Sequence, residues 1–282
     1  MKNSPVWLEV ALNGAAGRGF QPNIPISVEA IVAEAVECAH RGVSVIHLHA
    51  YDEQGQPCED ADIYARIIEQ IKAKVDVIIY PTLGLSGSIE ARLKPINSLI
   101  ERGLLEWGVV DPGSVNITHV SQIASDQDGF VYPNPDSHIK ACLASAAAHG
   151  WRPAYAIYEP GFARLGAALA AKYADLKQPV YRLMFSNGLL FGTPVSSTAL
   201  QFYYEHLHTT IESPHWMISG LDADVSEIMP QALELGAHVR VGLEDAPFGS
   251  PLTNLECVDQ ALRAIESQSR PLATVAQVRA AQ

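Results

Sequence analysis

Two histidines separated by one residue, His47 and His49, follow an apolar run in the segment SVIHLHAYDEQG. In a β-strand, residues i and i+2 point to the same side, so both imidazoles would face one way. Two imidazoles in this arrangement can share one metal ion. The other interpretation is that a strand merely carries two polar residues there, and the pair alone leaves both interpretations open.

A second pair with the same spacing, His206 and His208 in EHLHTT, lies in a segment with a helical pattern. Residues i and i+2 do not share a face of a helix, so this pair is not expected to bind one ion. The remaining histidines are expected at the surface or in loops: His40, His119, His138, His149, His215 and His238.

The segment HVRVGLED, residues 238–245, offers a third ligand. In a closed barrel of eight strands, the strand that carries this segment and the strand of the histidine pair both flank the first strand. Glu244 could then join His47 and His49. Two imidazoles and one carboxylate leave positions open for water or substrate, which is how catalytic zinc is usually held, although Fe(II) or Mn(II) would also fit.

Two neighbours of Glu244 have two interpretations each. Arg240, if it points into the barrel, is a buried cation that needs a partner. It could pair with Glu9 or Glu244 for stability, or its planar fork could hold a substrate carboxylate. Asp245 could cap a helix or act as a general base.

The elements that must position these residues recur evenly along the chain. Apolar runs rich in Val, Ile, Tyr and Trp occur at 6–13, 44–49, 76–82, 107–113, 152–159, 180–186, 215–221 and 238–245. Helical patterns lie between them, and strands without alternation are typical of parallel sheets buried on both faces. We expect one (β/α)8 TIM barrel domain over residues 1–282, with a doubly wound open sheet as the alternative.

Several local signals set the ends of the expected helices. Ser27 can cap a helix that ends before Gly42, and Pro95 and Pro230 are each expected in a first turn. The longest irregular segment is the loop at about 116–136, which is expected to be a lid or an oligomer contact.

In a barrel of this kind, the site lies where the strands end. Further polar candidates for substrate binding at these ends are Asn13, Thr82, Asp111, Ser114 and Asn116.

Composition narrows the partners. The net charge is −12, with 31 acidic and 19 basic residues and no Lys/Arg run, which argues against nucleic acid and anionic membranes. The four cysteines are scattered, as expected of a reduced cytoplasmic protein. No apolar stretch reaches the length of a membrane helix, and the first residues do not form a signal peptide.

Six motifs appear in order along nearly the whole chain: ALNGA, VIHLH followed by D-x-x-G-x-P, DPGSVN, YEPG, VRVGLED and RPLATVAQVRAA. In these motifs the chain resembles the β-keto acid cleavage enzyme family, which includes the 3-keto-5-aminohexanoate cleavage enzymes.

The resemblance implies a zinc-dependent (β/α)8 barrel in which a β-keto acid and acetyl-CoA give acetoacetate and a new CoA ester. By position, His47, His49 and Glu244 match the zinc ligands, and Arg240 and Asp245 match the catalytic Arg and Asp. Asp245 is then the proton handler and Arg240 orients it. The resemblance also implies a homo-oligomer, with a tetramer expected.

Thr82 matches a hydroxyl residue that contacts the keto acid, whereas other positions depart from the family pattern. Tyr51 stands where an Arg is usual, Ala16 and Ala156 replace carboxylates of the aminohexanoate-cleaving members, and Val109 indicates an altered pocket. We therefore expect the same reaction on a keto acid other than 3-keto-5-aminohexanoate.

Two further hypotheses stay open: a metal-dependent aldolase or lyase that works without CoA, and a non-catalytic member of the family. An amidohydrolase-type metal barrel is not expected, because its histidine pair ends the first strand, whereas His47 and His49 end the second.

Overall fold

The computed structural model describes residues 4–281. In this part of the chain, eight parallel strands form one sheet in the order β5-β2-β1-β12-β11-β10-β9-β6. The strands are β1 (Leu8–Ala11), β2 (Val45–Leu48), β5 (Ile78–Pro81), β6 (Trp107–Val109), β9 (Arg152–Ile157), β10 (Val180–Phe185), β11 (His215–Gly220) and β12 (His238–Val241). The two edge strands, β5 and β6, contact each other and bring the sheet round into a barrel. All eight predicted strands and the (β/α)8 class are confirmed.

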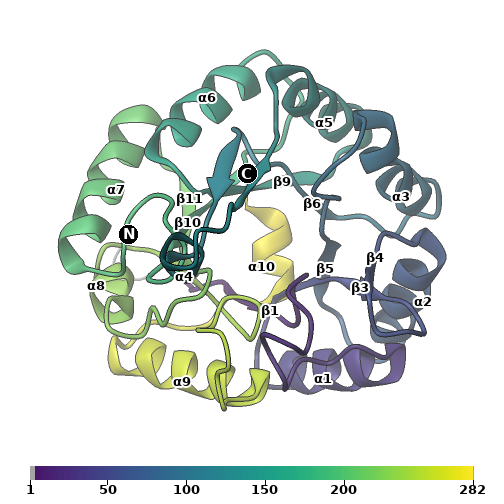
Figure 1. The fold of residues 1–282 in the computed structure, drawn as a ribbon, viewed down its shortest axis with the longest axis horizontal. Helices are drawn as coiled ribbons and strands as arrows, with labels where there is room; N and C mark the ends of the chain where they lie inside the picture. The colour runs from purple at the N-terminus through teal and green to yellow at the C-terminus, as the bar shows by residue number, and fades with distance from the viewer. Residues whose placement is uncertain (1–3, 282) are drawn as a thin grey trace.

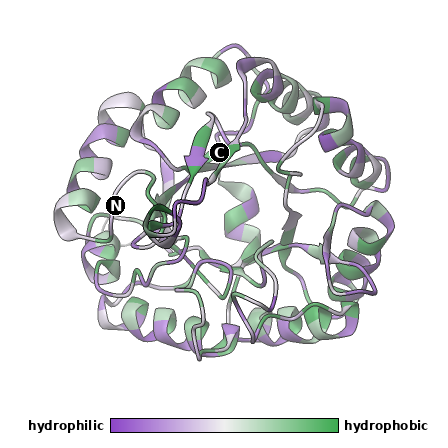
Figure 2. Ribbon diagram, viewed as in Figure 1, coloured by the Kyte–Doolittle hydropathy of each residue, from purple (hydrophilic) through white to green (hydrophobic). Residues whose placement is uncertain are grey.

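The helices that follow the strands form an outer ring (Figure 1). They are α1 (Val28–His40), α2 (Ala61–Lys72), α3 (Ile89–Glu101), α5 (Asp136–His149), α6 (Pro160–Ala170), α7 (Ser197–Thr210), α8 (Met229–Glu234) and α9 (Asn254–Ser267). Hydrophobic and hydrophilic residues are interspersed along these helices (Figure 2), as expected when one face packs on a sheet and the other meets solvent.

Helix starts follow the predicted signals, with one exception. Ser27 caps α1 by accepting a hydrogen bond from the backbone N–H of Ala30, and Pro230 lies in the first turn of α8. The first-turn prediction for Pro95 is wrong, because Ser88 caps α3 and leaves Pro95 in the interior of the helix. Its ring is buried, so packing offsets the backbone hydrogen bond that proline cannot donate.

A short last helix, α10 (Val275–Ala280), closes the end of the barrel at which the strands begin. Figure 1 shows it at the centre of the ring of helices. Arg279 on α10 forms ion pairs with Glu106, which precedes β6, and with Asp76, which precedes β5. The N–H of Ala273 bonds the carbonyl of Val6 at the entrance to β1. The segment 272–280 therefore covers this end of the barrel.

The segment predicted as a long irregular loop, 116–136, is ordered into a small substructure that we call the lid. It comprises β7 (Val115–Ile117), α4 (Val120–Ala124) and β8 (Phe130–Tyr132), and β7 and β8 pair antiparallel. The lid lies over the barrel, inside the ring of outer helices (Figure 1). A second small pair, β3 (Ala50–Tyr51) with β4 (Pro57–Cys58), follows β2.

The prediction that His238 lies in a loop or at the surface is wrong. His238 begins β12, is 7% exposed and stacks on Trp7 with ring centroids 4.2 Å apart. Its Nδ1 accepts a hydrogen bond from the backbone N–H of Trp7 at 3.1 Å. In residues 4–281 no helix is long and apolar enough to cross a membrane.

Candidate active site

The two histidines of the VIHLH motif lie side by side at the end of β2. Their rings are 5.2 Å apart, and both side chains are buried. The parallel pairing of β1 with β2 places His47 opposite Ala11. Asn13 fixes the backbone of His49 from β1, because its Oδ1 accepts the N–H and its Nδ2 donates to the carbonyl. The same amide also donates to the carbonyl of Pro25.

Glu244 reaches the two histidines through a tight turn after β12. Gly242 has φ +132°, and a Cβ there would lie 2.2 Å from the carbonyl oxygen of Ala11, so this position requires glycine. The turn lets the N–H of Glu244 bond the same carbonyl at 3.3 Å. Glu244 is thereby carried across β1 toward β2.

The three side chains meet as a candidate metal site. His47 Nε2 lies 3.3 Å from Glu244 Oε2, and His49 Nε2 lies 3.5 Å from Glu244 Oε1. One possible ligand atom from each of the three residues can be chosen so that these atoms all lie within 4.8 Å of one another. Two ligands bonded to one tetrahedral zinc at ~2.1 Å would stand ~3.4 Å apart, so these separations fit a shared ion.

The hydrogen bonding of the three residues also fits a metal. His49 Nε2 and Glu244 Oε2 are buried and have no hydrogen-bond partner within residues 4–281. A buried polar atom without a partner costs free energy unless something else binds it. A divalent ion would satisfy both atoms at once.

The protonation states of His47 and Glu244 are those that a metal needs. Burial lowers the pKa of His47 to about 3, so this imidazole is neutral at physiological pH. Burial alone would raise the pKa of Glu244, but His47, Arg240 and His49 together hold it well below its usual range. A neutral imidazole and an ionised carboxylate can bind a cation without first losing a proton.

A cavity of about 830 Å³ opens above these residues at the end of the barrel where the strands finish. His47, His49 and Glu244 lie in its wall together with Arg240. Lid residues Ile117, His119 and Phe130 form part of its mouth. The lid therefore borders the candidate site.

Arg240 is the centre of a buried ionic network. Its Nη1 donates to Glu9 at 3.0 Å and to the Tyr80 hydroxyl at 3.3 Å, and its Nη2 lies 3.2 Å from Glu244 Oε1. Its Nε and Nη2 bind both oxygens of Asp245 at 2.7–3.2 Å. The pairing that the sequence allowed with Glu9 or Glu244 thus exists with both, and Arg240 still lines the cavity.

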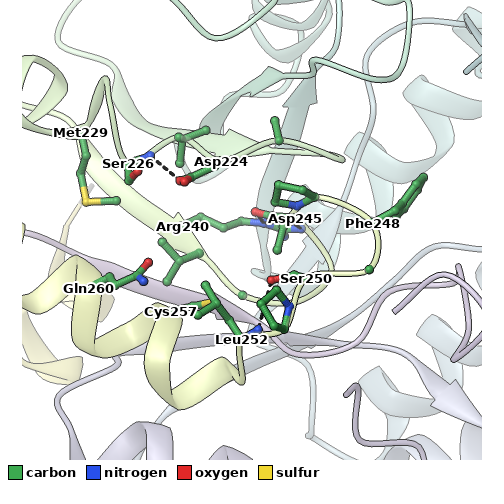
Figure 3. A pocket seen from close by; sticks show the side chains of 18 residues that line it. Asp224, Ser226, Met229, Arg240, Asp245, Phe248, Ser250, Leu252, Cys257 and Gln260 are labelled. Carbon is green, nitrogen blue, oxygen red and sulfur yellow. Dashed lines mark hydrogen bonds and ion pairs between the residues drawn. The ribbon is translucent and has the colours of Figure 1, made fainter. Parts of the chain in front are cut away.

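Asp245 lies behind Arg240 rather than in the wall of the larger cavity. It borders a smaller cavity of about 430 Å³ between β12, α8 and α9, and Arg240 lines both cavities. Figure 3 shows Arg240 extending toward Asp245 at the edge of this smaller space. The Ser219 hydroxyl donates to Asp245 at 2.8 Å. Burial raises the pKa of Asp245, and Arg240 opposes this shift.

The five candidates for substrate binding separate into three groups. Thr82 and Asp111 are buried and line the larger cavity. Asn13 lines it too, although its amide is used by backbone groups. Ser114 and Asn116 are exposed and are not among the lining residues. The Ser114 hydroxyl accepts the N–H of Asn134 and so supports the base of the lid.

Sequence reasoning missed Arg182 and Tyr80, which also face the interior of the barrel. Arg182 on β10 is 3% exposed and lines the larger cavity. Tyr80 on β5 donates to Glu9 at 2.5 Å. A signal existed for Arg182, because a lone arginine inside the apolar run VYRLMF must either bend outward or be a buried cation.

The mouth of the cavity is held by a contact between the lid and the loop after β11. His119 Nε2 lies 3.3 Å from Asp222 Oδ2, and its Nδ1 lies 2.6 Å from the Ser121 hydroxyl. Asp222 also accepts the N–H of Phe248. Because all four residues line the cavity, this contact positions the lid over the candidate site.

A family model described as beta-keto acid cleavage enzyme matches residues 5–281. The chain belongs to the β-keto acid cleavage enzyme family. It is therefore an enzyme of this class, and the predicted resemblance is confirmed.

Characterised relatives are similar over most of their length. The chain is 27% identical to 3-oxoadipate:acetyl-CoA acetyltransferase of Cupriavidus necator, covering 98% of this chain and 94% of that protein. It is 26% identical to the 3-keto-5-aminohexanoate cleavage enzyme of Acetoanaerobium sticklandii, covering 92% and 90%. Among solved structures, the ternary complex of ObcA with C4-CoA adduct and oxalate superposes with a TM-score of 0.72 at 17% identity, covering 92% of this chain and 67% of that chain. That likeness supports the barrel fold.

The positions at which the chain departs from the family pattern have clear structural environments. The Tyr51 hydroxyl donates to the carbonyl of Gly14 at 2.6 Å and anchors the loop after β1. Ala16 lines the mouth of the cavity. Ala156 is buried on β9, where its N–H bonds Asp111 at 3.1 Å. Alanine stands at both positions 16 and 156, so neither position offers a carboxylate to a substrate.

Proposed function

We propose that the enzyme exchanges acyl groups between a β-keto acid and acetyl-CoA at a zinc ion held by His47, His49 and Glu244. The CH2–COO⁻ unit of the keto acid would pass to the acetyl group and form acetoacetate. The remaining acyl group would take the CoA thiol and leave as a new CoA ester. The names of the two relatives support this reaction class.

One observation carries the proposal: two imidazoles and a carboxylate with buried, unpartnered ligand atoms lie together in the wall of a cavity that can hold a small acid. A divalent ion bound there supplies Lewis acidity to the oxygens of the keto acid. His47, His49 and Glu244 would hold the ion. Asn13 keeps the backbone of His49 in register with β1.

Arg240 would orient the substrate carboxylate and keep the reacting end in place. The guanidinium is fixed on one side by Glu9 and on the other by Asp245, so little side-chain entropy is lost when a substrate binds. Thr82 offers a hydroxyl from the same cavity wall.

We propose Asp245 as the group that accepts a proton from the CH2 unit of the keto acid and returns it when acetoacetate is formed. Its raised pKa fits that role. Because Asp245 borders the smaller cavity, the proton would cross beside Arg240. No cysteine of this chain is needed as a nucleophile, because CoA supplies the thiol.

The test is a panel of β-keto acids incubated with isotopically labelled acetyl-CoA and the zinc-loaded enzyme, with products read by mass spectrometry. Labelled acetoacetate together with an unlabelled acyl-CoA is the expected result, and His49→Ala should abolish both. His206→Ala is the matched control, because it removes a histidine from the helical pair and leaves the site intact. Cleavage that does not require acetyl-CoA would favour the aldolase or lyase, and a folded, metal-loaded protein without turnover would favour a non-catalytic member.

A further inference from the structure

The loop after β1, residues 14–26, lies against the tight turn that carries Glu244. Gln21 on this loop is 1% exposed, and the Nε2 atom of its amide lies 3.0 Å from three backbone carbonyl oxygens of the turn. These carbonyls belong to Leu243, Ala246 and Pro247. One side chain therefore holds the backbone on both sides of Glu244.

Gly14 forms a wall against the Glu244 side chain. Its φ is +64°, and a Cβ at this position would lie 2.8 Å from Cγ and 3.2 Å from Cβ of Glu244. Only glycine lets the main chain approach this closely, and glycine also adopts the left-handed φ at little cost. The Glu244 side chain is thus confined on this side by main chain, which cannot rotate away as a side chain would.

Tyr51 holds this wall in place. Its hydroxyl donates to the Gly14 carbonyl at 2.6 Å. The residue is 3% exposed and packs in an apolar cluster with Leu243, the neighbour of Glu244. Tyr51 lies on β3, two residues after His49. It therefore ties the segment that carries the histidines to the backbone that confines the carboxylate.

These contacts set a separation that matters for metal binding. His47 Nε2 and Glu244 Oε2 are 3.3 Å apart, and His49 Nε2 and Glu244 Oε1 are 3.5 Å apart. Ligands that share one zinc ion must keep such separations, because the ion bonds each of them at ~2.1 Å. Glu244 also lines the larger cavity, so without the wall its carboxylate could swing into that space and away from the histidines.

We infer that Tyr51 and Gln21 are positioning residues for the metal site, which hold Gly14 and the turn so that Glu244 stays within reach of both histidines. This inference rests on the metal site of the proposed function and adds two residues that act on it through backbone carbonyls. Partners that orient metal ligands contribute roughly 10–100-fold to metal affinity. Loosening either residue should therefore speed the loss of metal from a folded protein.

The experiment follows metal release rather than turnover. The enzyme is loaded with Co(II), and release of the ion to excess EDTA is followed by the loss of visible absorption. Tyr51→Phe removes only the hydroxyl, and Gln21→Met removes the amide while keeping a side chain of similar length. Each should speed release by roughly tenfold. Each should also change the absorption spectrum before EDTA is added, because the carboxylate no longer keeps its position at the ion.

Two glycines of the loop form a matched pair that tests the wall itself. Gly14→Ala and Gly17→Ala both place a side chain at a left-handed φ, +64° and +76°. A Cβ at Gly17 meets no atom of another part of residues 4–281 within 4 Å, whereas a Cβ at Gly14 meets Glu244. The backbone strain is similar in both variants, but only Gly14→Ala should release the ion faster, by roughly 100-fold.

Two further variants control for the loss of a buried hydrogen bond. Tyr155→Phe matches Tyr51→Phe, because the buried Tyr155 hydroxyl also donates to a glycine carbonyl, that of Gly166, at 3.2 Å. Gln178→Met matches Gln21→Met, because the Gln178 amide donates to two backbone carbonyls just before β11. Both controls should release Co(II) at the wild-type rate, and thermal melts show how far each substitution lowers stability.

The outcomes separate this inference from the proposed function. Release at the wild-type rate in Tyr51→Phe and Gln21→Met would overturn the inference, as would an equal acceleration in their controls. The proposed function would then stand if the unmodified enzyme still forms acetoacetate from a keto acid. If the unmodified enzyme binds no Co(II) that His49→Ala removes, the proposed zinc site fails and the inference fails with it.

Discussion

The Nε2 atom of His47 lies 3.3 Å from Oε2 of Glu244, although the two residues belong to the second and the last strand of the barrel. Closure of the sheet makes them neighbours, because β1 lies between β2 and β12. Residues that end these two strands therefore flank the same short element. The buried, unbonded atoms of His49 and Glu244 show that the arrangement is suited to a cation.

The first prediction concerns this ligand set. His49→Ala should lower the bound divalent metal from about one per chain to a small fraction, since one of three protein ligands is lost. Metal content after dialysis, measured by inductively coupled plasma mass spectrometry, checks this. His208→Ala should retain full metal content, because His208 belongs to the helical pair on α7. Equal metal loss in both variants would contradict a site at His49.

Much of this site could be predicted because strand parity and barrel closure are simple rules. Parity places His47 and His49 on one side of β2, and the order of strands brings Glu244 beside them. Neither the meeting of His47, His49 and Glu244 nor the eight strands required knowledge of side-chain contacts. The sequence likewise allows Arg240 to be a buried cation paired with Glu9 or Glu244, beside the alternative that it holds a substrate carboxylate.

Other features could not be predicted, because they depend on packing across the barrel. The run VYRLMF leaves open whether Arg182 bends outward or is buried, and nothing local in the sequence shows that Tyr80 packs between it and His47. The placement of Asp245 behind Arg240 depends on the turn at Gly242. His238 has an ordinary polar sequence context, and only the stacked Trp7 explains its burial.

The second prediction concerns the ionic network at the centre of the barrel. Glu9→Leu should reduce the free energy of unfolding by about 3 kcal/mol, because it removes the buried carboxylate to which both Arg240 Nη1 and the Tyr80 hydroxyl donate. Urea unfolding measures this change. Asp259→Asn removes a half-exposed partner of Arg41 and should cost less than about 1 kcal/mol. A similar cost for both variants would show that the network adds no special stability.

The third prediction concerns the contact that holds the lid. A Cβ at Gly188 would lie 1.8 Å from Asp222 Oδ2 and 2.7 Å from His119 Nε2. Gly188→Ala should therefore separate His119 from Asp222 at a cost of about 1–3 kcal/mol. Amide hydrogen exchange in residues 115–132 should rise about tenfold or more, and KM should increase.

Gly161→Ala is the control for the lid variant, because a Cβ at this position near the start of α6 meets no other atom within 4 Å. Its exchange in residues 115–132 should match that of the unmodified enzyme. Unchanged exchange in Gly188→Ala would mean that the contact between His119 and Asp222 does not hold the lid closed.

The fourth prediction concerns thiol reactivity. Cys38, Cys142 and Cys257 are buried, and burial raises each pKa to about 12. Cys58 on β4 is partly exposed, so iodoacetamide should modify it first. Intact-mass spectrometry should show one adduct on the native enzyme and four in urea. Activity should survive the single adduct. Loss of activity would mean that the reaction needs a cysteine of the enzyme in addition to the CoA thiol.

The last prediction concerns acid stability and His238. Burial, with His215 and Arg270 nearby, holds the pKa of His238 well below its usual range, and its Nδ1 must stay unprotonated to accept the N–H of Trp7. Below pH ~6.5 the unfolded chain binds a proton at this residue and the folded protein does not. Unfolding is therefore favoured as the pH falls, and this group contributes up to about 1.4 kcal/mol per pH unit. His238→Gln, which can still accept a hydrogen bond, should flatten the slope of unfolding free energy between pH 7 and pH 5. His149→Gln, at an exposed position at the end of α5, should keep it. An unchanged slope in His238→Gln would show that other groups set the acid limit.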